Sequence, residues 1–182
     1  MEIVAQAFGI VGMLFNILVF QQKKQENVLI CQFFAAATFA VNYFMLGAMV
    51  GGMLNVIGAV RSVVFYFKDK THANSIAWLI IFVLAFASSY PLTFFAFGTD
   101  MNTKNFIIEL LPVIAMIVAT ISLRVGVARA VRFFCLFTSP MWLVYNCFSG
   151  SYGAIASEIL NLISIVTGII RLDIKRDKKV QE

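Results

Sequence analysis

The chain has 182 residues, of which 61% are hydrophobic and 13% are charged. A soluble domain typically has ~45–50% apolar and ~25% charged residues, so this composition excludes an ordinary soluble protein and indicates a polytopic membrane protein. The formal net charge of +5 is then expected to orient the chain in the membrane and to attract anionic lipid. We expect no nucleic-acid partner.

Apolar segments fill almost the whole chain. A helix needs about 20 residues to cross the hydrocarbon core of a bilayer. Polar or glycine-rich breaks divide the chain into seven predicted spans, at residues 3–20, 28–47, 50–67, 75–97, 105–123, 126–147 and 152–171. The first span begins beside Glu2 and is not followed by a cleavage site, so we expect it to stay as a span and not to act as a secretory signal.

The basic residues predict the orientation of these spans. If the N-terminus lies outside, all of the 14 Lys and Arg residues except Arg61, within a span, and Lys104, outside, fall on the cytoplasmic side. The positive-inside rule predicts this bias for seven spans with a cytoplasmic C-terminus. The cytoplasmic residues are Lys23, Lys24, Lys68, Lys70, Arg124, Arg129, Arg132, Arg171, Lys175, Arg176, Lys178 and Lys179.

The spans form two similar triplets within a single membrane domain, residues 1–182. Residues 1–70 and 105–171 each contain a span, a basic loop, a second span, a tight break and a third span, and 75–97 is the linker helix. Asn42 corresponds to Asn146 at an offset of 104 (146 − 42), and Asn55 to Asn161 at 106 (161 − 55). Each triplet has an odd number of spans, so the linker helix is needed to restore the orientation of the second triplet. The two halves are then parallel, related by an axis along the membrane normal. The predicted fold is therefore all-α, with a 3+1+3 parallel repeat and a cytoplasmic tail at 172–182.

This plan resembles the SWEET and PQ-loop transporters. The resemblance implies that an Asn on the third span of each triplet faces a central substrate, and that an aromatic residue on the second span stacks on it. Asn55, Asn161 and Trp142, in "MWLVYN", take these places. The chain departs from that group where the first span ends in "FQQKK", without the Pro-Gln signature.

A second resemblance covers nearly the whole chain. "ELLPVI" (109–114), "AVRS" (59–62), the run from Trp142 to Asn146, and "GSYGAIASE" (150–158) follow one another as in the YgjV-like family of bacterial inner membrane proteins. The resemblance implies the bacterial inner membrane and brings no established activity. The residues that fit the family pattern are Arg61, Glu109, Pro112, Trp142, Asn146 and Glu158.

Arg61, Glu109 and Glu158 are ionisable residues inside predicted spans. Such a group costs ~2.5–3.5 kcal/mol at a helix centre and usually marks function. Glu158 shares a polar stripe with Asn161, which should face the bundle interior. Arg61 is its simplest partner, either directly or through water. The pair could line a central cavity, join the repeats as a structural ion pair, or be no pair at all if Arg61 reaches the cytoplasmic headgroups. A Glu158 without a nearby cation could carry a proton with the solute.

Other residues have both a functional and a structural interpretation. Glu109 and Pro112 lie near the start of the fifth span, where an acid suits the helix dipole and proline is tolerated, so a helix-start role and a pathway role both stay open. Pro140 is expected to kink its helix, either moving Trp142 across a cavity or packing as an ordinary kink.

Asparagines and glycines within the spans are open to similar alternatives. Asn42, Asn55, Asn146 and Asn161 either bind substrate or clasp neighbouring helices. Glycines 47 and 51 form a GxxxG motif, which predicts close packing of the third span.

The sequence thus predicts a transporter for a small polar solute, such as a sugar or small metabolite, in which the two triplets rock to give alternating access. The alternative is a non-transporting receptor, scaffold or interaction protein. We expect no enzyme, metal or cofactor, because the only histidine, His72, lies in a loop. Lipid and the solute are the expected partners, and a homo-oligomer stays open. The predicted substrate-binding residues are Asn42, Asn55, Arg61, Trp142, Asn146, Glu158 and Asn161, and the structural or gating residues are Gly47, Gly51, Glu109, Pro112 and Pro140.

Overall fold

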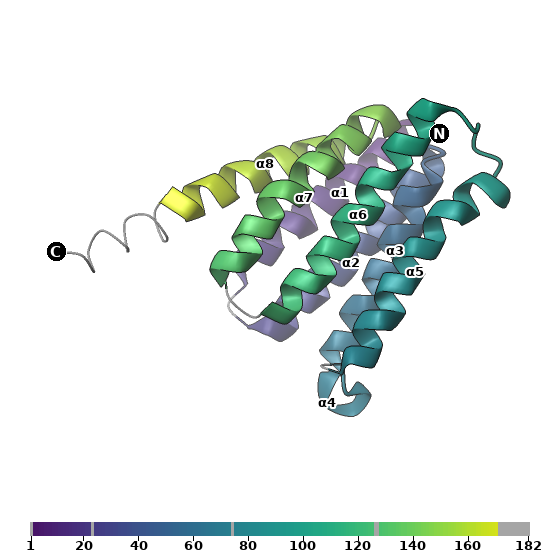
Figure 1. Ribbon diagram of the computed structural model, residues 1–182. Coiled ribbons are helices and arrows are strands. Elements are labelled where there is room, and N and C mark those ends of the chain that lie inside the picture. The colour runs from purple at the N-terminus through teal and green to yellow at the C-terminus, as the bar shows by residue number, and fades with distance from the viewer. Residues whose placement is uncertain (1, 23, 74, 126–127, 171–182) are drawn as a thin grey trace.

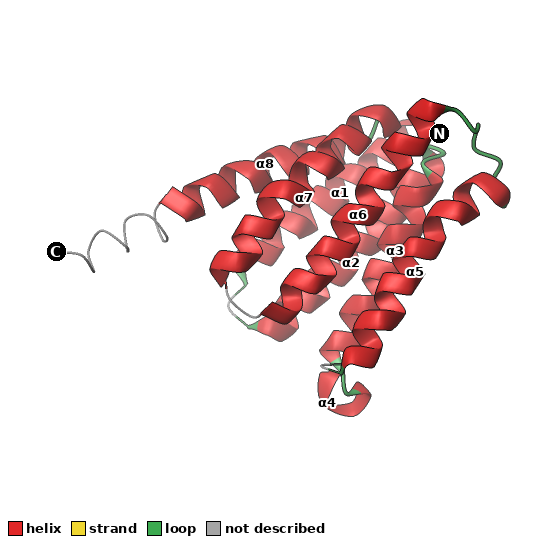
Figure 2. Cartoon of the chain, viewed as in Figure 1, coloured by secondary structure: helices red, strands yellow, loops and turns green. Residues whose placement is uncertain are grey.

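A helix lies at each predicted span. The computed structural model describes residues 2–22, 24–73, 75–125 and 128–170, and these contain helices but no strand (Figure 2). The whole predicted tail, residues 172–182, lies outside these ranges, as do Lys23 and the break near residue 126. The helices within them are α1 (Glu2–Gln21), α2 (Gln25–Met45), α3 (Met49–Tyr66), α4 (Lys68–Thr71), α5 (Ile76–Phe95), α6 (Thr103–Val125), α7 (Ala128–Ser149) and α8 (Tyr152–Gly168).

The apolar character of the helices confirms a multi-span membrane protein. Within the described ranges, α1, α2, α3, α5 and α6 are long and apolar enough to cross a bilayer. Helix α8 is apolar over Tyr152–Thr167 but shorter than these five. The count of seven spans therefore stays a prediction that depends on α7 and α8. The four-residue helix α4, in the predicted loop "KDKTHAN", was not predicted.

Six of the long helices form a closed ring. Neighbouring helices pack in the order α1, α2, α3, α6, α7 and α8, and α8 packs back on α1. Helix α5 packs against α3 and α6 from outside this ring (Figure 1). Each triplet therefore keeps its chain order, and the third helix of each triplet packs on the first helix of the other.

Two glycine turns lie at the same end of the bundle. Gly47, between α2 and α3, has φ 75°, and Gly150, between α7 and α8, has φ 68°. Only glycine adopts this left-handed conformation without strain. Gly47 is therefore needed for the turn and not for helix packing, because a Cβ atom there would meet nothing within 4 Å. The predicted packing role of the GxxxG motif is therefore wrong for Gly47. Gly51 does pack closely, since its Cβ would lie 2.8 Å from Cε1 of Tyr145.

Helices α1 and α8 meet at backbone contact. A Cβ atom added to Gly153 would lie 2.2 Å from the carbonyl carbon of Gly9 and 2.4 Å from its oxygen. In a membrane, helices associate largely through such close van der Waals packing, because lipid offers no hydrophobic driving force. The sequence interpretation missed this glycine pair, which joins the first helix to the last.

Helix α6 begins at Thr103, too early for Glu109 to lie in its first turn. The side-chain oxygen of Asn102 accepts a hydrogen bond from the Asn105 backbone N–H at 2.8 Å, which caps the helix before Thr103. Glu109 and Pro112 therefore lie inside the helix, and the proline is fully buried. A helix-start role for this pair is wrong. Pro140 lies inside α7 as predicted, and Pro91 lies inside α5.

Candidate functional site

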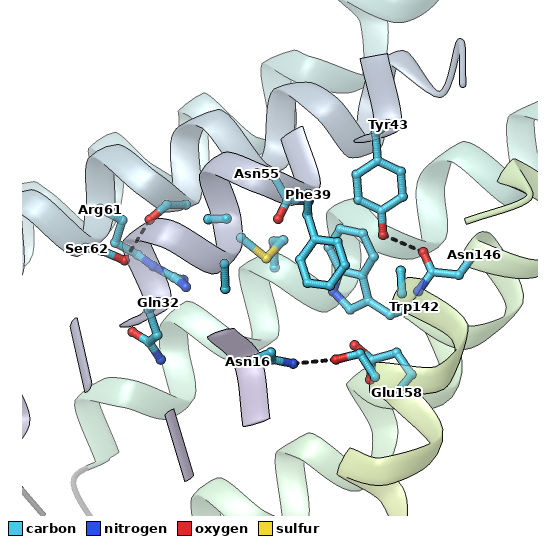
Figure 3. Close-up of a pocket in the computed structure, with 16 residues that line it drawn as sticks. Asn16, Gln32, Phe39, Tyr43, Asn55, Arg61, Ser62, Trp142, Asn146 and Glu158 are labelled. Atoms are coloured by element: carbon cyan, nitrogen blue, oxygen red, sulfur yellow. Dashed lines mark hydrogen bonds between the residues drawn. The ribbon is translucent and has the colours of Figure 1, made fainter. Parts of the chain in front are cut away.

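A cavity of about 190 Å³ lies inside the ring and is lined by residues from all six ring helices (Figure 3). Pockets for drug-sized ligands usually measure ~300–1,000 Å³, so this cavity suits a small occupant. Helices α2 and α3 from one triplet and α7 and α8 from the other supply most of the lining, and α1 and α6 complete it. The polar lining residues are Asn16, Gln32, Asn55, Arg61, Ser62, Asn146, Ser157 and Glu158.

Most of the predicted substrate-binding residues lie in this lining. Asn55, Arg61, Trp142, Asn146 and Glu158 all border the cavity. Asn55 donates to the Gly51 carbonyl of its own helix at 2.9 Å, and Asn146 is buried. The two remaining predictions, residues 42 and 161, are not part of the lining.

Arg61 reaches into the cavity from α3. Its Nη1 donates to the hydroxyl of Thr120 on α6 at 2.8 Å, and its Cζ lies 5.7 Å from the ring centroid of Phe86 on α5. The Thr120 hydroxyl in turn donates to the Met116 carbonyl at 2.7 Å. These contacts hold the guanidinium at the cavity wall. Figure 3 shows Arg61 among the lining residues. A side chain held in this way does not extend to the headgroups, which argues against the snorkelling alternative.

Glu158 borders the cavity from α8. Its Oε2 accepts a hydrogen bond from Asn161 at 3.5 Å, and Ser139 of α7 interacts with the same carboxyl group. No ion pair joins Arg61 to Glu158, although both residues lie within the described part of the chain. The predicted direct pair is therefore wrong, because Arg61 is held by Thr120 and Phe86 while Glu158 is held by α7 and its own helix.

An aromatic layer bounds the cavity on the side of the two glycine turns. The ring centroids of Tyr43 and Trp142 are 6.2 Å apart, and Tyr145 lies 5.9 Å from each of them. The Tyr43 hydroxyl donates to Oδ1 of Asn146 at 2.5 Å, and the Gly51 N–H donates to the Tyr145 hydroxyl at 2.8 Å. This layer joins α2 and α3 to α7, so it connects the two triplets.

Beyond this layer, hydrogen bonds join α1 and α2 to the α7–α8 turn. Gln6 donates to the Gly150 carbonyl at 2.7 Å and accepts from the Tyr152 N–H at 3.1 Å. Asn42 donates to the Ala5 carbonyl at 2.7 Å and accepts from the Ser151 hydroxyl at 2.5 Å. We refer to these five residues (Ala5, Gln6, Asn42, Gly150, Ser151) and Tyr152 as the turn-end network. Asn42 acts here as a clasp between helices, the second of the two roles predicted for it.

Replacing Asn42 with alanine is expected to destabilise the protein by about 1–3 kcal/mol, because it leaves buried partners unsatisfied. The loss should exceed the ~0.6 kcal/mol average for clasps between membrane helices, since Asn42 is 0% exposed and makes two bonds. Unfolding midpoints in detergent measure it. Asn161→Ala is the matched control, because Asn161 makes a single 3.5 Å bond. Equal losses for the two variants would contradict the clasp.

Glu109 lies outside the central cavity. It borders a second pocket of about 200 Å³ together with Gly47, Ala48, Lys104 and Tyr145. Its buried Oε2 has no hydrogen-bond partner, and Tyr145 interacts with its carboxyl group. Tyr145 thus stands between Glu109 and the central cavity. This position on α6 is compatible with the pathway role left open for Glu109, which stays a prediction.

The sequence interpretation missed several cavity residues. Asn16 donates to the Ser157 hydroxyl at 2.7 Å and so joins α1 to the neighbouring helix α8. Gln32, Phe39 and Tyr43 line the cavity from α2. Asn16 and Gln32 are polar residues within apolar segments, which is the signal that could have identified them. Phe39 had no signal, because the sequence contains 19 phenylalanines.

Metal-binding side chains do not gather anywhere in the described ranges. No group of three or more His, Cys, Asp or Glu residues there is placed to hold a metal ion. Cys31 and Cys135 are half-buried, Cys147 is exposed, and all three thiols are free.

Comparison with known proteins gives the family. Residues 3–176 match Imp-YgjV, described as bacterial inner membrane proteins. The chain is 24% identical over 167 residues to inner membrane protein YgjV of Escherichia coli (strain K12), covering 92% of this chain and 83% of that protein. No solved structure matches the chain. A match that runs through all the predicted spans and the cavity residues places the chain in the YgjV family of bacterial inner membrane proteins.

Proposed function

We propose that this protein is a transporter for small polar solutes and that the cavity inside the six-helix ring is its binding site. The observation that supports this most directly is the composition of the cavity wall. Arg61 and Glu158 both border a hollow of about 190 Å³ and do not neutralise each other. Charged groups within a membrane domain are rare and usually line a solute or ion pathway.

The proposed mechanism requires two related halves, and the turns suggest how they correspond. Gly150 follows Gly47 by 103 positions (150 − 47), and both have positive φ. The hydrogen-bonded pair Tyr43 and Asn146 is separated by the same 103 positions. We therefore replace the offsets of 104 and 106 predicted from the asparagines with one offset of 103, because the turns fix where the helices begin and end.

The new register pairs residues across the cavity. It relates Phe39 to Trp142 (142 − 39) and Asn55 to Glu158 (158 − 55), and all four line the cavity. An aromatic and a polar residue from each triplet would thus occupy equivalent places in the wall. In a two-fold arrangement, equivalent residues that touch, such as Tyr43 and Asn146, lie near the axis. This is the arrangement expected of a carrier built from parallel repeats.

The proposed orientation has the N-terminus outside and the C-terminus in the cytoplasm, as the distribution of Lys and Arg predicts. The two glycine turns then lie on the side of the membrane opposite the cytoplasm, and the cavity lies on the cytoplasmic side of the aromatic layer. Arg61 and Asn16, near the cytoplasmic ends of their helices, would lie toward the cavity entrance. Rocking of the triplets would open the turn-end network and close this entrance.

Uptake into proteoliposomes tests the proposal. Liposomes that contain the purified protein are exposed to a mixture of small sugars, polyols, carboxylates and amino acids, and the trapped solutes are identified by mass spectrometry. We expect at least one solute to enter faster than it enters protein-free liposomes. Trp142→Ala should slow this uptake, because it removes the aromatic wall that Tyr43 and Tyr145 pack against.

Glu26→Gln is the matched control, because Glu26 is exposed and lies at the start of α2, away from the cavity. It should leave uptake unchanged. If no solute enters faster than into protein-free liposomes, the transporter proposal is wrong. Solutes that bind the protein without entering would then favour the receptor or scaffold alternative.

A further inference from the structure

We infer that the occupant of the central cavity is a small zwitterion, with its carboxylate on Arg61 and its ammonium group on Glu158. This inference rests on the proposed transport function and deepens it by naming the class of solute. The juxtaposition that carries it is one cation and one anion on the wall of a single cavity, from opposite triplets, without an ion pair between them.

Arg61 and Glu158 lack the ion pair that two opposite charges in a membrane domain would be expected to form. In a medium of low dielectric constant, an arginine and a glutamate attract strongly, and charged side chains within membranes usually pair with each other. Among the described residues, each of these two side chains has neutral partners alone: Thr120 and the Phe86 ring for Arg61, and Asn161 and Ser139 for Glu158. Both side chains therefore remain available to a charged molecule in the cavity, which would supply the counterion that each of them lacks among the described residues.

Arg61 is prepared to bind a carboxylate. The guanidinium has five N–H donors in a planar fork that matches the two oxygens of a carboxylate. Only Nη1 is engaged, by Thr120, among the described residues. Thr120 and Phe86 come from α6 and α5, so three helices fix the direction of the guanidinium. In Figure 3 the group extends from α3 toward the interior of the cavity.

Glu158 provides the matching acceptor. A carboxylate accepts about four hydrogen bonds, and the contact with Asn161, at 3.5 Å, is a weak one. The aromatic rings of Phe39 and Trp142 lie in the wall near these groups and offer apolar surface for the methylene carbons of a solute (Figure 3). An ammonium group on such a solute would neutralise Glu158 without requiring Glu158 to move toward Arg61.

Other classes of solute fit the two charges less well. A simple carboxylate would satisfy Arg61 but leave Glu158 unneutralised and repelled, and a simple amine would do the reverse. A neutral sugar would leave both charged groups without a counterion inside a membrane domain, which is costly. The cavity volume of about 190 Å³ further limits the occupant to a small molecule.

A series of matched compounds tests the inference in proteoliposomes. Glycine, β-alanine and γ-aminobutyrate carry both charges at increasing separation, propionate and propylamine carry one charge each, and glycerol carries none. We expect at least one of the three zwitterions to be taken up at least tenfold faster than propionate, propylamine and glycerol. The preferred member of the series reports the separation between the Arg61 and Glu158 charges.

Two variants assign the charges to the residues. Glu158→Gln should reduce zwitterion uptake at least tenfold and raise the ratio of propionate uptake to zwitterion uptake. Arg61→Gln should also reduce zwitterion uptake at least tenfold, and it should raise the ratio of propylamine uptake to zwitterion uptake. The exposed pair Glu26→Gln and Lys70→Gln are the controls and should change neither ratio. If Arg61→Gln does not fold, Arg61→Lys replaces it, and a weakened preference for the zwitterion is expected because lysine lacks the planar fork.

The outcomes separate this inference from the transport proposal. Uptake of glycerol or of a singly charged compound, without preference for any zwitterion, would overturn the inference and leave the transporter standing. Zwitterion uptake that both charge variants leave intact would also overturn it. No uptake of any compound, including those in the wider mixture, would overturn both.

Discussion

The Gly153→Ala variant is expected to be destabilised by roughly 1–3 kcal/mol or more, although it adds a single methyl group. The new Cβ atom would lie 2.2 Å from the backbone of Gly9, well inside van der Waals contact. A clash with a flexible side chain can be relieved by a rotamer change, but here the obstacle is the main chain of α1. The ring must open between α1 and α8 to accommodate it.

The unfolding midpoint in detergent measures this effect, with Gly58→Ala as the matched control. Gly58 is also a buried helical glycine, but its nearest neighbour would be Cε of Met116 at an ordinary 3.5 Å. Since alanine is favoured over glycine by about 1 kcal/mol in a helix interior, this control should be neutral or stabilising. A Gly153→Ala protein as stable as the control would show that α1 and α8 do not meet in the way described.

Locking the turn-end network is expected to stop transport. Cysteines at Gln6 and Tyr152, in a protein whose three native cysteines are replaced by alanine, would lie on α1 and α8, which belong to different triplets. A short reagent that joins two thiols would then hold the outer ends of the triplets together. Because alternating access requires these ends to separate, uptake should fall to the level of protein-free liposomes.

Each single-cysteine variant, treated with the same reagent, controls for modification alone and should keep its uptake. A cleavable version of the reagent should restore uptake after reduction, because the lock is then removed. Unchanged uptake in the fully cross-linked protein would contradict a mechanism in which α1 and α8 part at this end, and would leave a solute path that does not depend on rocking of the triplets.

The helices could be predicted from the sequence because hydrocarbon imposes a strong and local constraint. Backbone polar groups in lipid must be satisfied within the segment itself, so a long apolar run marks a helix without any knowledge of its neighbours. Helix α6 shows the limit of this reasoning. Its start depends on the side chain of Asn102 capping Asn105, and a hydrophobicity pattern does not contain such a contact. The helix-start role considered for Glu109 and Pro112 failed for that reason, because both residues lie inside α6.

The site was predictable only in part, because hydrophobicity does not tell which helices are neighbours. Arg61 and Glu158 were recognised as unusual, and both line the cavity. A direct ion pair between them was wrong, because Thr120 and Phe86 come from helices whose positions the sequence did not reveal. Asn42 was also predicted as a possible cavity residue, but it lies outside the cavity. It has the same chemistry as Asn146, yet only the ring geometry shows that it is a clasp away from the cavity.

The backbone contact between α1 and α8 also bears on how the protein is made. Chains emerge from the ribosome N-terminal end first, and the hydrogen bonds that Gln6 forms with Gly150 and Tyr152 span 144 and 146 residues of sequence. The first helix therefore enters the bilayer long before its partner is synthesised. Until the last helix inserts, Gly9 lacks Gly153 as its packing partner, so a chain whose synthesis stops early is left with an open ring of helices.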